Sequence, residues 1–334
     1  MALSALRQIG PFAGRQASEL AIAGQGLWQA LKDHRAGQFE QALLAYGRLL
    51  RQAQLCRETL PVYRAIETLL ADHRNALAAH QIAWQQPERM VFFLGYSRSG
   101  HSLVGSLLDA HPDILIAHEA HALKHIAAGV AAHRVLKALQ INAYFYHYFG
   151  REYTGYDYQV PGQYQGQLTR PVIIGDKKGN GSARLLRRHP ELLFDLEQRL
   201  GCPFQLVHVL RNPWDNIATK AKRTGASLDT AAQRYFANCQ LIDQLQARFP
   251  NRFVEVYLEQ LIAAPKPTLT QLLKALSIDN LAEDYLDACA GIVFTKPNRS
   301  ALKVAWPDGL KVSIERQIAE YPFLSPYAHP EAGP

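Results

Sequence analysis

The sequence predicts an α/β fold, a P-loop-like parallel sheet flanked by helices, with an all-helical extension at the N-terminus. Short apolar runs alternate with segments of helical periodicity from about residue 88 onward. The first of these runs ends in a loop with the G-x-x-x-x-G outline of a phosphate-binding loop. The region before it is rich in Ala, Leu and Gln, a composition typical of helices.

Length and composition fit one large globular domain with an appendage, since the chain has 334 residues, 48% of them hydrophobic. The formal net charge of +7 suits an anionic ligand, a nucleic acid or a membrane surface. The basic residues are scattered rather than gathered in a block, so we expect no nucleic-acid partner. The four cysteines form no C-x-x-C pair, which is typical of a reduced, cytoplasmic protein.

We expect three regions along the chain. Residues 1–18 form a flexible lead-in without the apolar core of a signal peptide, and a weak contact with a membrane surface is the alternative. Residues 19–87 form a helical cap in which 34–50 resembles one tetratricopeptide helix pair. One such unit cannot form a stable solenoid, so the cap should pack on the main domain of residues 88–334, or bind a protein partner or a second copy.

Five apolar runs in the main domain are predicted strands, and helical segments follow them. In a parallel sheet covered on both faces, ligands bind at the carboxyl ends of the strands, so the informative residues should stand just after each run. The helices after the first two runs are expected at 102–110 and about 120–140. The predicted strands are residues 90–95, 113–117, 171–175, 204–210 and 252–258.

The loop after the first predicted strand is a candidate anion site. Its glycines allow close backbone approach, and the amides at the start of the next helix favour a phosphate or sulfate. Arg98 adds a fork of donors that suits either anion. His101 stands where an ATP-binding loop has its lysine. A Gly/Ser-rich turn without a ligand is the alternative, because such turns are common.

Charged residues follow the second and third predicted strands. Glu119 comes after the second and is placed to act as a general base, although a glutamate here could also serve only the start of its own helix. Lys177 comes after the third and could neutralise charge on a leaving group. A solvated pair with Lys178 is the alternative for that lysine.

Three histidines near Glu119 raise the question of a metal. His121 and His125 are one helical turn apart and could share an ion. The stretch that begins at His118 is one residue short of H-E-x-x-H, and no third ligand is evident. We therefore expect no metal.

A second anion site is predicted after the fourth strand. Asn212 suits the N-cap, Pro213 the first helical position and Asp215 the first turn of a helix. Arg211 thus lies beside a helix N-terminus, with Thr219 two turns further along. Two anion sites in one crevice require a ligand with two separated charged groups.

These residues resemble the motifs of sulfotransferases that use 3′-phosphoadenosine 5′-phosphosulfate (PAPS). The stretch R-S-G-H-S at 98–102 is similar to the family's loop for the 5′-phosphosulfate, and 210–219 is similar to its 3′-phosphate motif, with Thr219 in place of a serine. A third motif, E-D-L-x-x-x-P-x-x-x-L-x-x-L, is similar to 259–273. The similarity runs from about residue 90 to 327.

The stretch 98–112 resembles most closely the branch that contains tyrosylprotein sulfotransferases. The resemblance implies metal-free, in-line transfer of the sulfuryl group from PAPS to a hydroxyl or amine. Glu119 falls on the branch's catalytic Glu, although other branches use a His and His118 is adjacent. The implied catalytic residues are Glu119, Lys177, Arg98 and His118.

The resemblance also implies how PAPS is held. The loop amides and Arg98 would bind the 5′ side, Arg211 and Thr219 the 3′ phosphate, and a lid near the C-terminus would cover it. His101 replaces a Thr of the family, and Leu103 stands where many cytosolic members have a Trp. The implied PAPS-binding residues are Arg98, Ser99, Gly100, His101, Ser102, Arg211, Thr219, Lys296 and Arg299.

The acceptor is not named by the sequence. A Tyr-rich stretch, 142–167, should line its pocket, and a small metabolite or a sugar is expected, with a protein tyrosine left open. Two other functions compete with this one. An ATP-dependent P-loop kinase would need a lysine at position 101 and an Asp that holds Mg²⁺. A non-catalytic helical-repeat adaptor on a dead transferase fold would need no intact site.

Overall fold

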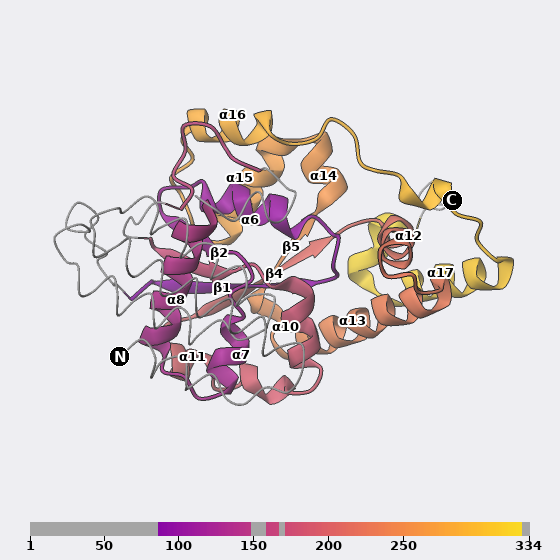
Figure 1. The fold of residues 1–334 in the computed structure, drawn as a ribbon, viewed down its shortest axis with the longest axis horizontal. Coiled ribbons are helices and arrows are strands. Elements are labelled where there is room, and N and C mark those ends of the chain that lie inside the picture. The colour runs from indigo at the N-terminus through magenta and orange to yellow at the C-terminus, as the bar shows by residue number, and fades with distance from the viewer. Residues whose placement is uncertain (1–85, 148–157, 167–170, 329–334) are drawn as a thin grey trace, which may run out of the picture.

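The computed structural model describes residues 86–147, 158–166 and 171–328. Within them a five-stranded sheet with the order β2-β3-β1-β4-β5 forms the centre (Figure 1), and every neighbouring pair of strands is parallel. The strands are β1 (Arg89–Gly95), β2 (Ile114–Ala117), β3 (Ile173–Asp176), β4 (Phe204–Leu210) and β5 (Phe253–Tyr257).

The strand prediction is confirmed, with shifts of one or two residues at the ends. The third strand begins at Ile173 rather than at Pro171, which has no N–H to donate to a neighbouring strand. The single helix expected over 120–140 is wrong: the chain forms α7 (Ala122–Ala127) and α8 (Ala132–Phe145) instead. Gly129, at φ +78°, breaks the helix between them.

Helices cover both faces of the sheet (Figure 1). The remaining α-helices are α6 (His101–Asp109), α10 (Gly179–Leu186), α11 (Leu196–Leu200), α12 (Pro213–Thr224), α13 (Leu228–Arg248), α14 (Leu258–Ala263), α15 (Pro265–Ala275), α16 (Glu283–Gly291) and α17 (Asp308–Glu320). Short 3₁₀ helices are η2 (Pro190–Leu193), η3 (Pro250–Arg252), η4 (Ser300–Lys303) and η5 (Pro322–Tyr327).

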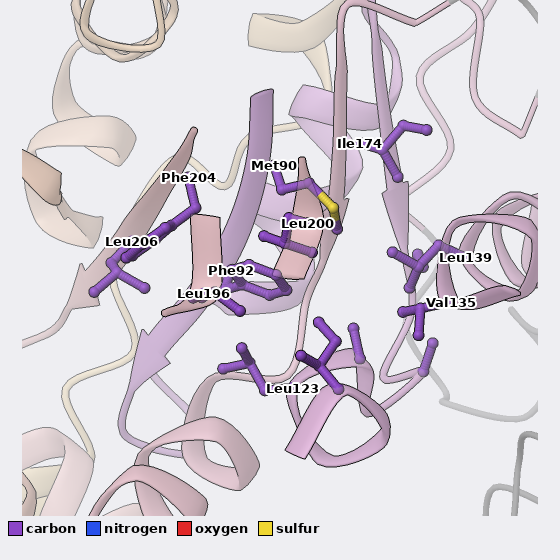
Figure 2. Packing of buried hydrophobic residues seen from close by; sticks show 14 of the residues in the cluster. Met90, Phe92, Leu123, Val135, Leu139, Ile174, Leu196, Leu200, Phe204 and Leu206 are labelled. Carbon is purple, nitrogen blue, oxygen red and sulfur yellow. The ribbon is translucent and has the colours of Figure 1, made fainter. Parts of the chain in front are cut away.

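The central strand is buried on both faces, as its continuous apolar sequence predicts. Met90 and Phe92 point to the cluster that Figure 2 shows, where they pack with Leu123 of α7 and Leu139 of α8. Val91 and Phe93 face the opposite cluster, built with α6, α14, α15 and α16. Each fully buried apolar side chain stabilises the fold by about 1.5–3 kcal/mol, so the carboxyl ends of the strands are fixed in place.

The expected lead-in and nearly all of the helical cap fall on residues 1–85, outside the described part of the chain, so both stay predictions. The Tyr-rich stretch is described only in part. None of the helices described here is long and apolar enough to cross a membrane.

Candidate active site

The loop between β1 and α6 folds as its glycines require. Gly100 has φ +95°, and a Cβ there would lie 2.7 Å from Leu258 Cδ1, so no larger residue fits without a shift. Ser99 is fully buried, and its Oγ accepts a hydrogen bond from Asn216 Nδ2 at 2.9 Å. Asn216 also donates to the carbonyl of Ser97 at 3.2 Å. Asn216 of helix α12 therefore fixes the loop through two hydrogen bonds. The backbone amides of the loop lie at the start of α6.

His101 has a structural role that its position in the motif did not reveal. Its imidazole is buried, and Nε2 donates to the carbonyl of Leu94 at 3.0 Å. Burial lowers the pKa of His101 to about 4, so the ring is neutral near pH 7. A Cβ on Gly179 would overlap with the ring, so α10 starts close against it. Contact with an anion at this position therefore falls to the main-chain amide.

Glu119 and Lys177 meet at the carboxyl edge of the sheet, as predicted from their places after β2 and β3. Lys177 Nζ lies 3.1 Å from Ser102 Oγ, 3.2 Å from His118 Nε2 and 3.4 Å from Glu119 Oε1. Lys178 also reaches this carboxylate, through Oε2, so it is not the solvated surface residue considered above. The three strand ends thus form one cluster of charges.

The two lysines keep Glu119 ionised. Burial by itself would raise the pKa of Glu119, but the charges of Lys177 and Lys178 outweigh it and hold that pKa well below its usual range. Burial lowers the pKa of Lys177, and the charge of Glu119 opposes that shift. The Glu119 side chain keeps 44% of its surface exposed, so the carboxylate can still meet a ligand.

His118 lies behind this cluster. Its ring is buried and stacks on Tyr146, with ring centroids 3.7 Å apart. Its backbone N–H donates to Asn142 Oδ1 at 2.6 Å, and Asn142 Nδ2 donates back to the His118 carbonyl at 3.3 Å. These contacts fix its ring edge against Lys177.

Asp176 is a site residue to which sequence reasoning assigned no role. Its carboxylate is buried and accepts hydrogen bonds from the backbone N–H of Ala120 at 2.9 Å and of Ala122 at 2.7 Å. These bonds anchor a turn in which Glu119 has φ +57° and His121 has φ +59°, the left-handed region that non-glycine residues rarely adopt. Asp176 therefore sets where Glu119 points. Its signal in the sequence was a carboxylate at the last position of a buried strand.

The residues predicted to form the second anion site gather at the start of α12. Asn212 Oδ1 caps α12 by accepting from Trp214 N at 2.9 Å, as expected. Arg211 donates to the carbonyls of Arg98 at 3.2 Å and Asn298 at 2.5 Å, and Thr219 Oγ1 donates to Ser300 Oγ at 2.9 Å. The segment that sequence reasoning proposed as a lid therefore lies directly on the start of α12.

Two further contacts hold this arrangement. Arg299 Nε lies 4.0 Å from the buried carboxylate of Asp215, which also accepts from Ala301 N at 2.8 Å. Glu259 Oε1 accepts from Asn212 N at 2.9 Å, which explains the glutamate of the third sequence motif.

A cavity of about 770 Å³ is lined both by the β1–α6 loop and by Arg211, which precedes α12. Apolar and aromatic side chains form part of its wall, a composition typical of small-molecule sites. Of the predicted site residues, Ser99, His118, Thr219 and Arg299 do not line it. Those that do are Arg98, Gly100, His101, Ser102, Glu119, Lys177, Arg211 and Lys296. The apolar and aromatic lining residues are Leu103, Leu123, Tyr158, Leu185, Leu258, Ile262 and Phe294.

The histidines considered as metal ligands do not form a centre in the described chain. Within residues 86–147, 158–166 and 171–328, no three His, Cys, Asp or Glu side chains gather in a way that could hold an ion. Burial and the nearby charge of Lys178 together lower the pKa of His121 to about 4.

Three solved structures resemble the chain. The sulfotransferase domain of the Synechococcus PCC 7002 olefin synthase has a TM-score of 0.38 and 20% identity over 68% of this chain and 86% of that one. The sulfotransferase domain from the curacin biosynthetic pathway has a TM-score of 0.44 and 18% identity over 71% and 98%. Sulfotransferase STF9 from Mycobacterium avium has a TM-score of 0.45 and 13% identity over 92% and 97%.

No curated protein sequence matches the chain significantly. The branch of tyrosylprotein sulfotransferases is not tested by these findings and stays a prediction. A family model described as "Sulfotransferase family" matches residues 90–283, more than half of the chain and every strand of the sheet apart from Arg89, the first residue of β1. The chain therefore belongs to the sulfotransferase family, and it is a transferase.

Proposed function

We propose that the protein transfers the sulfuryl group of PAPS to a hydroxyl or amine of a small acceptor, a metabolite or a sugar, with Glu119 as the general base. The observation that carries this proposal is the meeting of Glu119, Lys177 and Ser102 in the cavity that Arg98 and Arg211 also line. One cavity thus offers a base, a cation for a leaving group and two separate anion sites.

The 5′-phosphosulfate fits the β1–α6 loop. The amides of residues 99–102 and the guanidinium of Arg98 supply donors for its oxygens. Burial lowers the pKa of Arg98, and the charges of Arg223 and Arg211 lower it further. Cations gathered in this way repel one another until an anion lies between them, so the loop is suited to a strongly charged ligand.

The 3′ phosphate fits the start of α12. Arg211 donates there to two carbonyls. A phosphate would replace these carbonyls as its acceptor, because a hydrogen bond between two charged groups is stronger than one to a neutral carbonyl. Thr219 of the same helix adds a hydroxyl. Lys296 and Arg299 come from the predicted lid segment, residues 295–300, which lies on the start of α12. The apolar wall of Tyr158, Leu258, Ile262 and Phe294 suits the adenine between the two phosphate sites.

The transfer step balances with residues of this chain. The acceptor oxygen or nitrogen forms a bond to sulfur and gives its proton to Glu119. The bond from sulfur to the bridging oxygen breaks, and its electron pair stays on the 5′ phosphate. Lys177 stabilises that charge, assisted by Arg98. The product is 3′-phosphoadenosine 5′-phosphate (PAP), beside the sulfated acceptor.

Glu119 suits the role of base better than His118 does. Glu119 lines the cavity, whereas the His118 ring is stacked on Tyr146 and faces Lys177. The low pKa of Glu119 reflects the two lysine charges. Once the phosphosulfate gives those lysines another anion to bind, the pKa of Glu119 rises and the carboxylate becomes a stronger base.

The kinase alternative requires a lysine at position 101 and an Asp that is free to hold Mg²⁺, and this geometry supports neither. His101, at the position of the lysine, is held in the interior by the Leu94 carbonyl. Asp176, which ends the strand next to β1, has both carboxylate oxygens bound to backbone N–H groups. No described feature favours ATP over a nucleotide with separated phosphates.

Calorimetric titration with PAP, beside ATP with Mg²⁺, tests the donor site. We expect PAP alone to bind the wild-type protein, and Arg211→Ala to weaken it by about 10- to 100-fold, since hydrogen bonds to charged groups contribute about 1.5–3 kcal/mol each. Arg187→Ala is a matched control, because Arg187 is exposed and does not line the cavity. Binding of ATP with Mg²⁺ alone, or of neither nucleotide, would overturn the proposal.

A further inference from the structure

Asn180 brings an uncharged hydrogen-bond donor into the cavity, and the proposed transfer step does not use it. Asn180 is the second residue of α10 and lines the cavity. Its Oδ1 accepts a hydrogen bond from Nδ2 of Asn238, on α13, at 3.2 Å. Its own Nδ2 has no partner in the part of the chain that the structure describes. A side-chain amide carries two N–H groups on its nitrogen, so both donors of Asn180 are left for a ligand.

Asn238 fixes which way round the Asn180 amide lies. The Asn238 side chain is buried, and its Nδ2 also donates to the carbonyl of Gly95 at 3.4 Å. Because a carbonyl can only accept, Asn238 must turn its nitrogen toward Gly95 and Asn180. Asn180 must then present its oxygen to Asn238. The Asn180 nitrogen is therefore the end of the amide that is left to face the cavity.

This orientation leaves one polar atom unsatisfied in the interior. Asn238 Oδ1 is buried and has no hydrogen-bond partner among the described residues. A buried oxygen without a partner destabilises a fold, and native proteins contain few of them. Rotation of the Asn238 amide would not help, because it would turn two oxygens, Asn238 Oδ1 and Gly95 O, toward each other. The fixed orientation of Asn180 is what this strained arrangement provides.

Asn180 lies between the β1–α6 loop and the general base. Its neighbour Gly179 lies against the ring of His101, at the end of that loop. Lys177, three residues before Asn180, contacts Glu119. In the proposed function the 5′ phosphate lies on the loop and the acceptor lies at Glu119, so the sulfuryl group passes between the two. The start of α10 lines the cavity beside that path.

We propose that Asn180 binds the sulfuryl group of the donor, with Nδ2 donating a hydrogen bond to a sulfuryl oxygen of PAPS, and that Asn238 is the positioning residue that orients it. PAP lacks the sulfuryl group, so this contact forms with the substrate and is lost with the product. Asn180 therefore raises the affinity for PAPS relative to PAP. The inference rests on the proposed function, since it requires PAPS as the donor.

Calorimetry with PAPS and with PAP, in the absence of an acceptor, tests the inference. Asn180→Ala should weaken the binding of PAPS by about tenfold or more, because a hydrogen bond to a charged group is lost, and should leave PAP affinity within about twofold. Asn180→Asp places a carboxylate of nearly the same shape against the sulfuryl oxygens and should weaken PAPS further. Asn251→Ala is the matched control, because Asn251 is exposed and does not line the cavity.

Asn238→Ala tests the positioning role. By itself it should lower the ratio of PAPS affinity to PAP affinity, because the Asn180 amide can then turn. In the Asn180→Ala background it should not change that ratio further, whatever stability it costs. Three results would overturn the inference: equal losses for PAPS and PAP in Asn180→Ala, no loss for PAPS in that variant, or a further fall of the ratio in the double variant. Failure of the proposed function is separate, because it shows as wild-type protein that binds neither PAPS nor PAP.

Discussion

Glu119 and Lys178 form an ion pair at the carboxyl edge of the sheet, between Oε2 of the carboxylate and Nζ of the lysine. The other carboxylate oxygen, Oε1, lies 3.4 Å from Lys177 Nζ. A carboxylate with a cation on each oxygen is a weak base, because protonation would cost both attractions. The strength of Glu119 as a base therefore depends on its two lysines.

Replacement of Lys178 tests that dependence. Lys178→Gln removes one of the charges that hold the pKa of Glu119 below its usual range, so that pKa should rise. Because Glu119 must be ionised to act as a base, the acidic limb of the pH profile of kcat/KM should move to higher pH. Measured rates from pH 4 to 8 check this, with Arg187→Gln as the control. An unmoved limb would show that Lys178 does not set this pKa.

Two variants separate the candidate bases. Glu119→Gln should lower kcat by about 10²- to 10⁴-fold, the usual contribution of a general base, and leave PAP affinity nearly unchanged. His118→Asn should retain a larger share of the activity, because the His118 ring lies behind Lys177. Turnover of PAPS with one acceptor gives both values. The reverse ranking would assign the base to His118.

Asp176→Asn tests whether the turn before α7 positions Glu119. An amide offers one acceptor oxygen where the carboxylate offers two, so one of the N–H groups of Ala120 and Ala122 loses its partner. We expect a loss of about 1–3 kcal/mol in unfolding free energy and a lower kcat. PAP affinity should stay within about twofold of the wild-type value. Equal losses in kcat and in PAP affinity would indicate a structural role alone.

Sequence patterns predicted the sheet because the strands are short, mainly apolar runs, and the central one, β1, is apolar and buried from Met90 to Gly95. Placing the chemistry after the strands then followed from topology, and the structure brings Glu119 and Lys177 within 3.4 Å as a result. The prediction failed where one residue decides the path of the chain. Gly129 divides the expected helix into α7 and α8, although the pattern of apolar residues on either side fits one continuous helix.

Pairwise contacts inside the site could not be predicted in this way. Lys178 was weighed as a surface residue since its partner, Glu119, is far away in sequence and turns toward it only because Asp176 holds the turn. His101 was taken as a donor-binding residue from its place in the motif. Its turn inward depends on the free space at Gly179 and on the Leu94 carbonyl, neither of which a motif encodes.

Thr219→Val should weaken the binding of PAP through the 3′ phosphate alone. Valine keeps the shape of threonine but removes the hydroxyl that now meets Ser300. Loss of one hydrogen bond to a charged group should reduce PAP affinity by about tenfold, while affinity for adenosine 5′-monophosphate stays the same. Calorimetry with both nucleotides checks this, with Thr219→Ser as the conservative control. Equal losses for the two nucleotides would place Thr219 away from the 3′ phosphate.

His101 should make the fold sensitive to acid. Its pKa is about 4 in the folded protein and about 6.5 when unfolded, so between these values the unfolded chain binds more protons. Stability from this group is complete above pH 6.5 and falls as the pH drops toward 4. The expected contribution to the loss between pH 7 and pH 5 is about 2 kcal/mol.

Urea unfolding of His101→Asn at both pH values isolates this contribution. Other groups titrate in the same range, among them His208, whose pKa burial also lowers, so the wild-type protein and the variant must be compared. The variant should be less stable at pH 7, where it lacks the fitted imidazole, and should lose about 2 kcal/mol less than the wild type on going to pH 5. Parallel losses in the two proteins would mean that His101 is already protonated, or still exposed to water, in the folded state. In that case the ring would be available to the cavity, and its exclusion from anion binding would be wrong.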